Sequence, residues 1–494
     1  MKFLPLLLLL ILPLTARQQP ESSAGNIASL YTESGGYKNS AEDPLPTISA
    51  TTMALRTLRY LGSDTQDTRP QQAFLLSRYQ PAEAAFAENG SGKPTVLANA
   101  FALMLMGELR MPEDVHAVSA RDYLVENASA FDEIYMAMAG LAVMGLSDEI
   151  PASWMKLMMD TAISEDPQVT AYDKSRAIVT CMRTGFNLPD YSRFLESLQT
   201  ALKEATANPD FHRDPIALQQ AYTLARALVM VDGRFDLNLP ALVEIGNENP
   251  PIARHYRLAA LHAWQPKLKG HLTVAICTGF APVGFRNEAG EISGMDADIM
   301  RAFAKEHSYH LDFVEQVKFN GIWELPARGI VDAATSGLSK RSDRLLPGIR
   351  WSYPYFNVER SLSILKSNAD RFRSIADFDG MKIAVTAGTT GDQDIRERNP
   401  NTIRIPYDSE EAAINDLLAG KVHALARGDV SNRYDARLNP ELAVIDTHPM
   451  VPVEEFVIAV SSERIALGQK LDRFLRQSRR DRSLEKIFAK YLEE

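Results

Sequence analysis

The sequence predicts a multidomain protein in which an all-α domain of helical hairpins is followed by an α/β domain. Three observations support this prediction. The chain has 494 residues, which is too long for a typical single domain. Apolar residues in its first half recur at three- and four-residue spacing, as they do on helices. After residue 266, short β-branched runs alternate with amphipathic stretches, which is typical of α/β folds.

The first 17 residues have the layout of a secretory signal peptide. Lys2 is followed by an apolar run from Phe3 to Leu14 and by the small residues Thr15 and Ala16. The run has about a dozen residues, fewer than the ~20 that a membrane span requires. We therefore expect residues 1–17 to direct secretion to a bacterial periplasm, with a retained membrane anchor as the alternative.

The composition is that of an ordinary globular protein, with 45% hydrophobic and 23% charged residues. The net charge of −10 argues against a general nucleic-acid-binding protein. The arginines between residues 473 and 482 are interleaved with acidic residues, so we expect a solvated helix face there. The two cysteines, Cys181 and Cys277, are too few for a disulfide framework or a cysteine metal cluster. We expect neither a metal nor an organic cofactor.

Residues 18–266 form the predicted helical domain. Similar apolar units, such as TTMALRTLRYLG and YMAMAGLAVMGL, recur roughly every 40 to 50 residues and are separated by proline-containing turns. A weak repeat of this kind favours stacked helical hairpins that bury one shared core. The many methionines of this region are expected in that core, and its scattered histidines are expected to be structural or exposed.

The start of this domain, SGGYKNSAEDPLPTISATTMALRTLRYLG, resembles the repeats of the α/α-toroid families, the terpenoid cyclases and protein prenyltransferases. The resemblance covers about 30 residues and implies a toroid-like arrangement of helices. Neither an Asp-rich cyclase motif nor a zinc-ligand trio is present, so the sequence does not support prenyl chemistry.

Residues 267–494 form the predicted second domain, which is joined to the first by a short linker, WQPKLKG, at residues 264–270. In order, this half contains FAPVGF, GEISGMDADIMRAFA, GIVDAATSGLSKRSDR, WSYPYF, KIAVTAGTT and LLAGKVHALARGD. Together these motifs resemble the family-three periplasmic solute-binding proteins, the class that binds polar amino acids for import. The resemblance implies a two-lobed, type II periplasmic-binding-protein fold, with the second lobe at about residues 369–448.

One segment, TSGLSKRSDR, has the residues needed to hold a carboxylate. A buried ligand carboxylate needs charge-assisted donors, and an arginine fork can bind both of its oxygens. By the family spacing, Arg344 and Ser339 would clamp the carboxylate, with Gly337 lining the approach. A surface loop with a stray arginine is the alternative.

The resemblance implies three further ligand-binding residues. Thr390, in a strand-to-helix turn, would bind the ligand, although a simple helix cap is the alternative. Phe280 would stack on the ligand side chain, and Trp323 is a candidate second wall or a core residue. Asp429 would hold the α-ammonium group, but it follows Gly420 by nine residues instead of the usual eight.

Three functions remain open at this stage. The first is reversible, non-catalytic binding of a small carboxylate, most of all an amino acid, for transport through an inner-membrane permease or for sensing. The second is catalysis, because DVSNRYDARLNPELAVID resembles the cyclohexadienyl dehydratases. Those enzymes have a glutamate where this chain has Asn432, and an amide cannot act as a general acid. The third is a periplasmic interaction or sensory protein that uses the helical half as a docking surface.

Overall fold

The computed structural model describes residues 20–63, 67–111, 115–185, 191–242, 250–316, 318–346, 348–446 and 453–492. The predicted signal peptide, residues 1–17, lies outside the described residues. The chain divides into two compact units. The first contains the described residues up to Gly270 together with Glu463–Ala466, and the second contains His271–Ser462 and the residues from Leu467 onwards. Among the described helices, none is long and apolar enough to cross a membrane.

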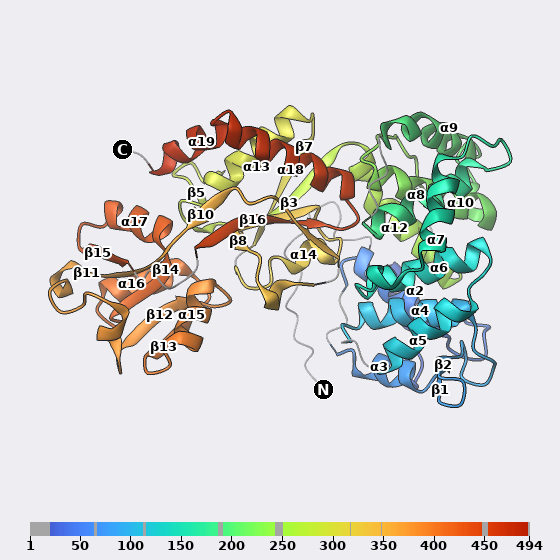
Figure 1. Ribbon diagram of the computed structural model, residues 1–494, viewed down its shortest axis with the longest axis horizontal. Helices are drawn as coiled ribbons and strands as arrows, with labels where there is room; N and C mark the ends of the chain where they lie inside the picture. Colours follow the sequence, from blue (N-terminus) through green and yellow to red (C-terminus); the bar gives the residue numbers. More distant parts are fainter. Residues whose placement is uncertain are drawn as a thin grey trace. The chain divides into compact units, whose positions relative to one another are not determined.

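The first unit is built from helices, which confirms the all-α prediction (Figure 1). Its helices are α1 (Pro20–Ser29), α2 (Ile48–Tyr60), α3 (Arg69–Leu76), α4 (Val96–Glu108), α5 (Val115–Asn127), α6 (Phe131–Val143), α7 (Ala152–Ile163), α8 (Ala171–Arg183), α9 (Leu195–Ala205), α10 (Pro215–Met230) and α12 (Ile252–Leu268). A short hairpin of β1 (Tyr79–Gln80) and β2 (Ala85–Phe86) interrupts them. Several helices begin where the sequence places a hydroxyl or carboxyl cap, because Thr47, Thr95, Thr170 and Asp214 each accept a backbone N–H of the first turn.

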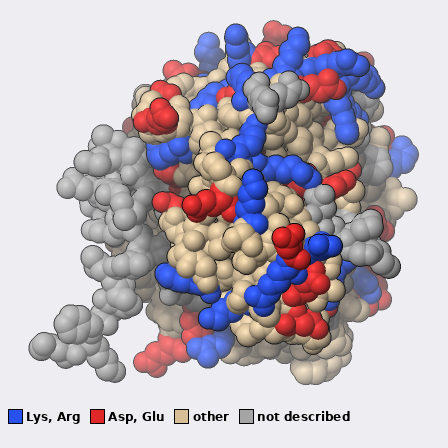
Figure 2. Space-filling model, turned by 90° about the vertical axis from the view of Figure 1, so that its left-hand side faces the viewer, with Lys and Arg blue, Asp and Glu red and all other residues tan. Residues whose placement is uncertain are grey.

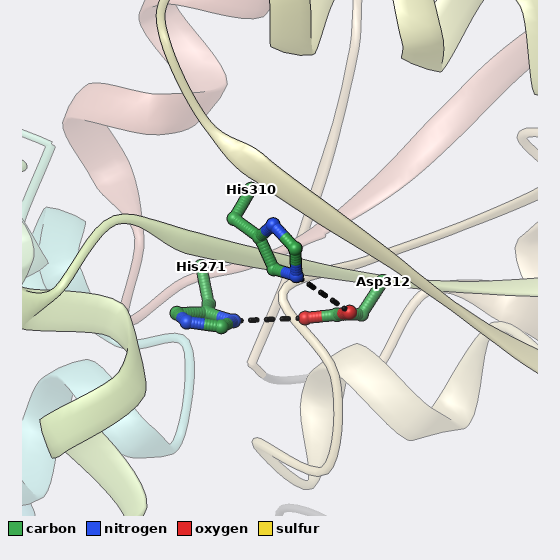
Figure 3. Close-up of side chains that lie close together, drawn as sticks. All are labelled: His271, His310 and Asp312. Atoms are coloured by element: carbon green, nitrogen blue, oxygen red, sulfur yellow. Dashed lines mark hydrogen bonds and ion pairs between the residues drawn. The ribbon is translucent and has the colours of Figure 1, made fainter.

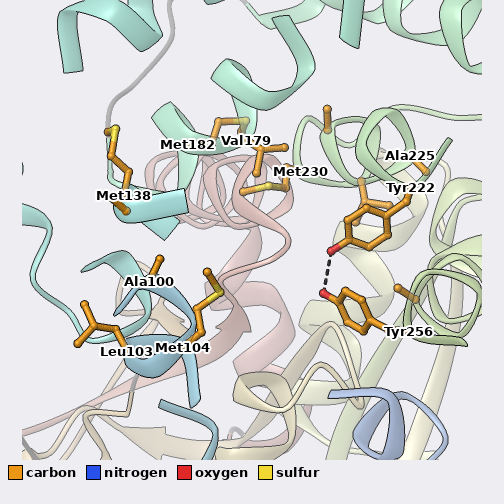
Figure 4. Close-up of a cluster of buried hydrophobic side chains, with 14 of the residues drawn as sticks. Ala100, Leu103, Met104, Met138, Val179, Met182, Tyr222, Ala225, Met230 and Tyr256 are labelled. Atoms are coloured by element: carbon orange, nitrogen blue, oxygen red, sulfur yellow. Dashed lines mark hydrogen bonds between the residues drawn. The ribbon is translucent and has the colours of Figure 1, made fainter. Parts of the chain in front are cut away.

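Alternate helices of this unit pack as a closed ring. Helix α2 packs on α4, α4 on α6, α6 on α8, α8 on α10, α10 on α12, and α12 returns to α2. Helices α5, α7 and α9 pack against members of the ring. This arrangement fits the expected toroid-like fold. Methionines fill much of the shared core, among them Met104, Met138, Met182 and Met230 (Figure 4).

The ring also encloses a cluster of charged and aromatic side chains. Arg56 and Arg59 of α2 contact Glu108 of α4 at 2.7 and 3.2 Å. Arg226 of α10 lies 4.0 Å from Glu463, which belongs to the short C-terminal segment of this unit. Burial alone would raise the pKa of Glu463, but the guanidinium groups of Arg226 and Arg59 outweigh it and lower the pKa to about 2. Glu463 therefore balances positive charge inside the ring.

The predicted linker at residues 264–270 is mostly helical in the structure. Helix α12 continues through Pro266 to Leu268, because Trp264 and Leu268 are almost completely buried in the core of the ring. Pro266 removes one helical N–H donor, and the burial on both sides of it outweighs this loss. The predicted boundary between residues 266 and 267 thus falls within α12.

The second unit is α/β, as predicted, and contains two larger sheets. The first has the strand order β10 (Phe356–Val358), β16 (Glu454–Ser461), β8 (Ala333–Ser339), β3 (His271–Cys277) and β7 (His310–Gln316), with β9 (Ile349–Trp351) paired to β16. Strand β3 runs parallel to β7 and β8, whereas β16 runs antiparallel to β8, β9 and β10. A small sheet of β4 (Gly279–Phe280), β5 (Gly284–Arg286) and β6 (Ile292–Ser293) follows β3 in the chain.

The second sheet has the order β13 (Ile403–Tyr407), β12 (Lys382–Thr386), β14 (Ala424–Gly428), β11 (Arg360–Leu365) and β15 (Leu442–Asp446). It lies in the orange part of Figure 1, with α15 (Thr390–Arg398), α16 (Glu410–Leu418) and α17 (Asp429–Leu438). The sheet includes β11, which precedes residue 369, where the sequence analysis places the start of the second lobe. The chain thus passes from one sheet to the other between Val358 and Arg360 and returns with β16.

The remaining helices of the second unit are α13 (Met295–Glu306), α14 (Glu324–Ala327), α18 (Ile465–Arg480), whose first two residues belong to the first unit, and α19 (Ser483–Leu492). Helices α13 and α19 pack on each other. The face drawn in Figure 2 carries basic side chains interspersed with acidic ones. This mixture is what the interleaved charges of the sequence favour for solvated surfaces.

We expect Glu463→Gln to destabilise the helical unit by about 3 kcal/mol at neutral pH, because it leaves buried guanidinium groups without a compensating charge. Chemical unfolding of the full chain at several pH values measures this. Because folding lowers the pKa of Glu463 from 4.5 to about 2, its carboxylate stabilises the folded chain fully above pH 4.5. This stabilisation is lost as the pH falls toward 2. The difference between wild type and variant should therefore be constant above pH 5 and shrink below it. The exposed Glu455→Gln is the matched control, and equal effects of the two substitutions would contradict the account.

Candidate functional site

A pocket lies between the two larger sheets of the second unit. It holds about 370 Å³ of space free of protein atoms, its open mouth included. Aromatic residues, glycines and four charged side chains line it. The lining residues are Phe280, Phe319, Gly337, Arg344, Thr389, Thr390, Gly391, Glu410, Arg427, Gly428, Glu454 and Phe456. Of the predicted ligand-binding residues, Arg344, Gly337, Thr390 and Phe280 are among them.

Arg344 is completely buried, although its guanidinium carries a charge. Nη1 donates to the carbonyl oxygen and to Oγ of Ser339, at 3.0 and 3.1 Å, and Nη2 donates to the carbonyl oxygen of Gly388 at 2.6 Å. Its Nε has no hydrogen-bond partner, and among the described residues it has no carboxylate within ion-pair distance. Burial lowers the pKa of Arg344 to about 10, and nearby Arg341 adds to this effect.

Two aromatic rings support this guanidinium. The Arg344 carbon Cζ lies 4.5 Å from the centre of the Trp323 ring and 5.5 Å from that of Phe319. Such contacts between a cation and a ring face partly replace the lost water. Trp323 is not a wall of the pocket, since it packs in a core cluster beside Phe319. The second aromatic wall next to Phe280 is Phe319, which the sequence analysis did not single out.

The backbone around Gly337 is held by Asp296, a residue of α13. Its carboxylate accepts hydrogen bonds from Gly337 N–H at 2.8 Å, from Thr335 Oγ1 at 2.5 Å and from the Tyr355 hydroxyl at 2.6 Å. Burial raises the pKa of Asp296, and these donors oppose the shift. Its role in the structure is to fix the strand that leads to Ser339.

Gly337 is required where it stands for two reasons. Its φ is +62°, a left-handed conformation that favours glycine. A Cβ atom at this position would also lie 2.8 Å from the Phe280 ring and 2.9 Å from the Phe456 ring. The backbone can therefore approach the pocket only without a side chain here.

The other side of the pocket is formed by the start of α15. Thr389 caps this helix, because its hydroxyl accepts a hydrogen bond from Asp392 N–H at 3.2 Å. Thr390, for which the cap role was the alternative, is instead the first helical residue. The Thr390 hydroxyl donates to Glu454 at 2.5 Å and lies 3.2 Å from the Ser339 hydroxyl. The first amides of a helix have no intrahelical acceptor, so this end suits a negatively charged group.

Two acidic residues missed by the sequence analysis complete the lining. Glu454, at the start of β16, forms an ion pair with Arg360. Glu410 of α16 forms an ion pair with Arg427 of β14 at 2.7 Å. Burial raises the pKa of Glu410 to about 7, although Arg427 opposes the shift. The pocket thus presents both signs of charge.

The predicted residues Ser339 and Asp429 do not line the pocket. Ser339 positions Arg344 through the two hydrogen bonds described above. Asp429 begins α17, where its carboxylate accepts Glu359 N–H at 3.0 Å and lies 3.6 Å from Arg433. Gly428, eight residues after Gly420, lines the pocket in its place.

The side-chain amide of Asn432 is held by hydrogen bonds to two neighbouring side chains. It is completely buried, its Oδ1 accepts from Arg427 Nε at 2.9 Å, and its Nδ2 donates to Ser361 Oγ at 2.8 Å. Both functional groups of the amide are therefore engaged by neighbouring side chains. This arrangement holds Arg427 and leaves no titratable proton at position 432.

The comparisons with known proteins concern the second unit. Residues 272–494 match the family described as bacterial extracellular solute-binding proteins, family 3. The C-terminal region carries a family-3 solute-binding domain. The type II periplasmic-binding-protein fold expected for this region is thereby confirmed.

Several relatives of the solute-binding domain are named for the amino acid that they bind. The ABC transporter arginine-binding protein 1 of Escherichia coli is 28% identical over 42% of this chain and 84% of its own length. A probable histidine-binding protein of Neisseria gonorrhoeae is 26% identical over 44% of this chain and 81% of its own. Among solved structures, an amino acid ABC transporter substrate-binding protein of Streptococcus pneumoniae bound to L-arginine is 23% identical, covering 46% of this chain and 98% of its own, with a TM-score of 0.43.

We expect Asp296→Ala to destabilise the solute-binding domain by about 2–4 kcal/mol, because it leaves three buried donors without an acceptor. Urea unfolding of the full chain measures the change. Asp408→Ala, which removes an exposed ion pair with Lys318, should cost less than about 1 kcal/mol. A cost for Asp296→Ala no larger than that of the control would show that the carboxylate does not hold this strand.

Proposed function

We propose that the solute-binding domain reversibly binds a small carboxylate, most of all an amino acid, without catalysing a reaction. The observation that supports this proposal is the complete burial of the charged Arg344 side chain, which has no carboxylate within ion-pair distance among the described residues. A buried charge without a paired opposite charge is costly, and an arginine fork matches a carboxylate in geometry. The unpartnered Nε of Arg344 belongs to a side chain that lines the pocket. A ligand carboxylate would supply the missing negative charge.

The other lining residues support an amino acid as the ligand. Phe280 and Phe319 provide apolar surface for a side chain, and the first turn of α15 offers Thr390 as a further donor. Glu454 is the better placed partner for an α-ammonium group, because it lines the pocket and Asp429 does not. A carboxylate oxygen can accept more than one hydrogen bond, so the contacts of Glu454 with Arg360 and Thr390 leave it able to bind an amine.

We further propose that the protein is exported and acts in amino-acid transport or sensing in the periplasm. The signal-like sequence of residues 1–17 and the names of the relatives, which are described as arginine- and histidine-binding proteins, support this. Transport would require an inner-membrane permease as partner. A dehydratase-type enzyme is the less supported alternative, because Asn432 stands in place of the general acid and both ends of its amide are engaged.

A sensory role is the second candidate. The family match begins at residue 272 and leaves the ring of helices outside it. The helical unit lies outside the matched solute-binding domain, and it could serve as a docking surface for a partner protein.

The experiment is a thermal-shift screen of the protein against amino acids, simple carboxylates, prephenate and arogenate. A ligand at 100 times its dissociation constant should stabilise the protein by about 2.7 kcal/mol. Arg344→Ala should weaken binding by about 2–5 kcal/mol, whereas Arg341→Ala, in the same turn but paired with Asp343 and not lining the pocket, should bind normally.

A parallel pair of variants tests the amine partner. Glu454→Gln should weaken binding of an amino acid more than binding of its deaminated analogue, and Asp429→Asn should affect both little. If Asp429→Asn instead gives the selective loss, the amine partner is Asp429. If ligand binding survives Arg344→Ala unchanged, the carboxylate clamp is wrong.

A further inference from the structure

Two histidines and one aspartate converge away from the pocket, on the strands β3 and β7. The parallel register pairs His271 with His310 and Thr273 with Asp312. Residues two apart on a strand share a face, and paired residues on neighbouring strands do as well. The fold therefore brings His271, His310 and Asp312 to the same face of the sheet. Figure 3 shows both imidazole rings turned toward the carboxylate.

The three side chains lie close enough together to share one metal ion. Nδ1 of His271 lies 2.9 Å from Oδ2 of Asp312, and Nε2 of His310 lies 3.3 Å from Oδ1. One ligand atom from each residue lies within 4.8 Å of the other two. Zinc bonds of about 2.0–2.2 Å in tetrahedral geometry place ligand atoms roughly 3.4 Å apart. Small side-chain rotations would bring these three atoms to that spacing.

We propose that His271, His310 and Asp312 form a binding site for a divalent transition metal, with Zn²⁺ as the probe of choice. Two imidazole nitrogens and a carboxylate oxygen suit zinc and similar ions, whereas Mg²⁺ and Ca²⁺ prefer all-oxygen sites. The three side chains are 38–68% exposed, so the remaining coordination positions are open to water. The metal would link the first residues of β3 to β7, which is the edge strand of its sheet.

This site is separate from the amino-acid pocket. His271 is the first residue of β3, and the pocket residue Phe280 follows the other end of that strand. Seven residues of strand span about 20 Å. The metal proposal therefore does not depend on the proposed function, and its failure would leave the proposed function untouched.

The test is metal titration of the full-length protein, freed of any affinity tag and treated with a chelator. Isothermal titration with Zn²⁺ should show one site, and Co²⁺ in its place should give the visible absorption of a low-symmetry complex. His310→Gln and Asp312→Asn should each weaken binding at least about tenfold. The matched control is His307→Gln, which removes a histidine that also neighbours a carboxylate, that of Glu306, outside the cluster.

Two results would overturn the proposal. Absence of a stoichiometric site would mean that the three residues form only an imidazole–carboxylate hydrogen-bond cluster. A site that persists in both His310→Gln and Asp312→Asn would lie elsewhere in the chain. Circular dichroism of each variant establishes whether it is still folded, so that a loss of metal binding is not mistaken for unfolding.

Discussion

The pocket of the solute-binding domain depends on one constraint, which is the burial of the Arg344 guanidinium. A charge in this position requires donors and acceptors arranged in advance, because water cannot solvate it. Ser339 and Gly388 take up part of its hydrogen-bonding capacity from opposite sides of the pocket. Trp323 lies under its face. Among the described residues no carboxylate lies within ion-pair distance of it, and we propose that a ligand carboxylate fills this role.

The surrounding fold serves this arrangement. Asp296 anchors the strand that carries Gly337 and Ser339, so it acts through the backbone. Gly337 allows that backbone to pass between Phe280 and Phe456. Thr390 and Glu454 join the start of α15 to the start of β16 across the pocket. In the proposed function, each of these residues would help to fix the geometry of the carboxylate clamp before the ligand arrives.

The sequence predicted the parts of the site that lie on local motifs. Arg344, Gly337 and Thr390 occur in short turns whose spacing is informative, and all three line the pocket. Glu454 and Glu410 were missed because an acidic residue at the start of a strand or helix looks like any solvated surface residue. Asp429 is not among the lining residues, whereas its neighbour Gly428 is, and spacing alone does not reveal which of two adjacent residues faces inward.

In the ring of helices, too, the sequence revealed the local elements but not the contacts between residues distant in the chain. Apolar spacing predicted its helices, because a buried helical stripe repeats every three or four residues. It did not predict the charged interior, where Arg56, Arg59 and Arg226 meet acidic partners. One of those partners, Glu463, is more than 200 residues distant in the chain from Arg226. Pairing at such separation leaves no local pattern in a single sequence.

The most direct test of the central claim compares a ligand with its own carboxamide. Once the screen has identified an amino acid, calorimetric titration of the unmodified protein measures the affinity of that amino acid and of its α-carboxamide. We expect the amide to bind at least about 30-fold more weakly, since a neutral group cannot compensate the charge of Arg344. Equal affinity for both compounds would show that the Arg344 guanidinium does not bind the ligand carboxylate.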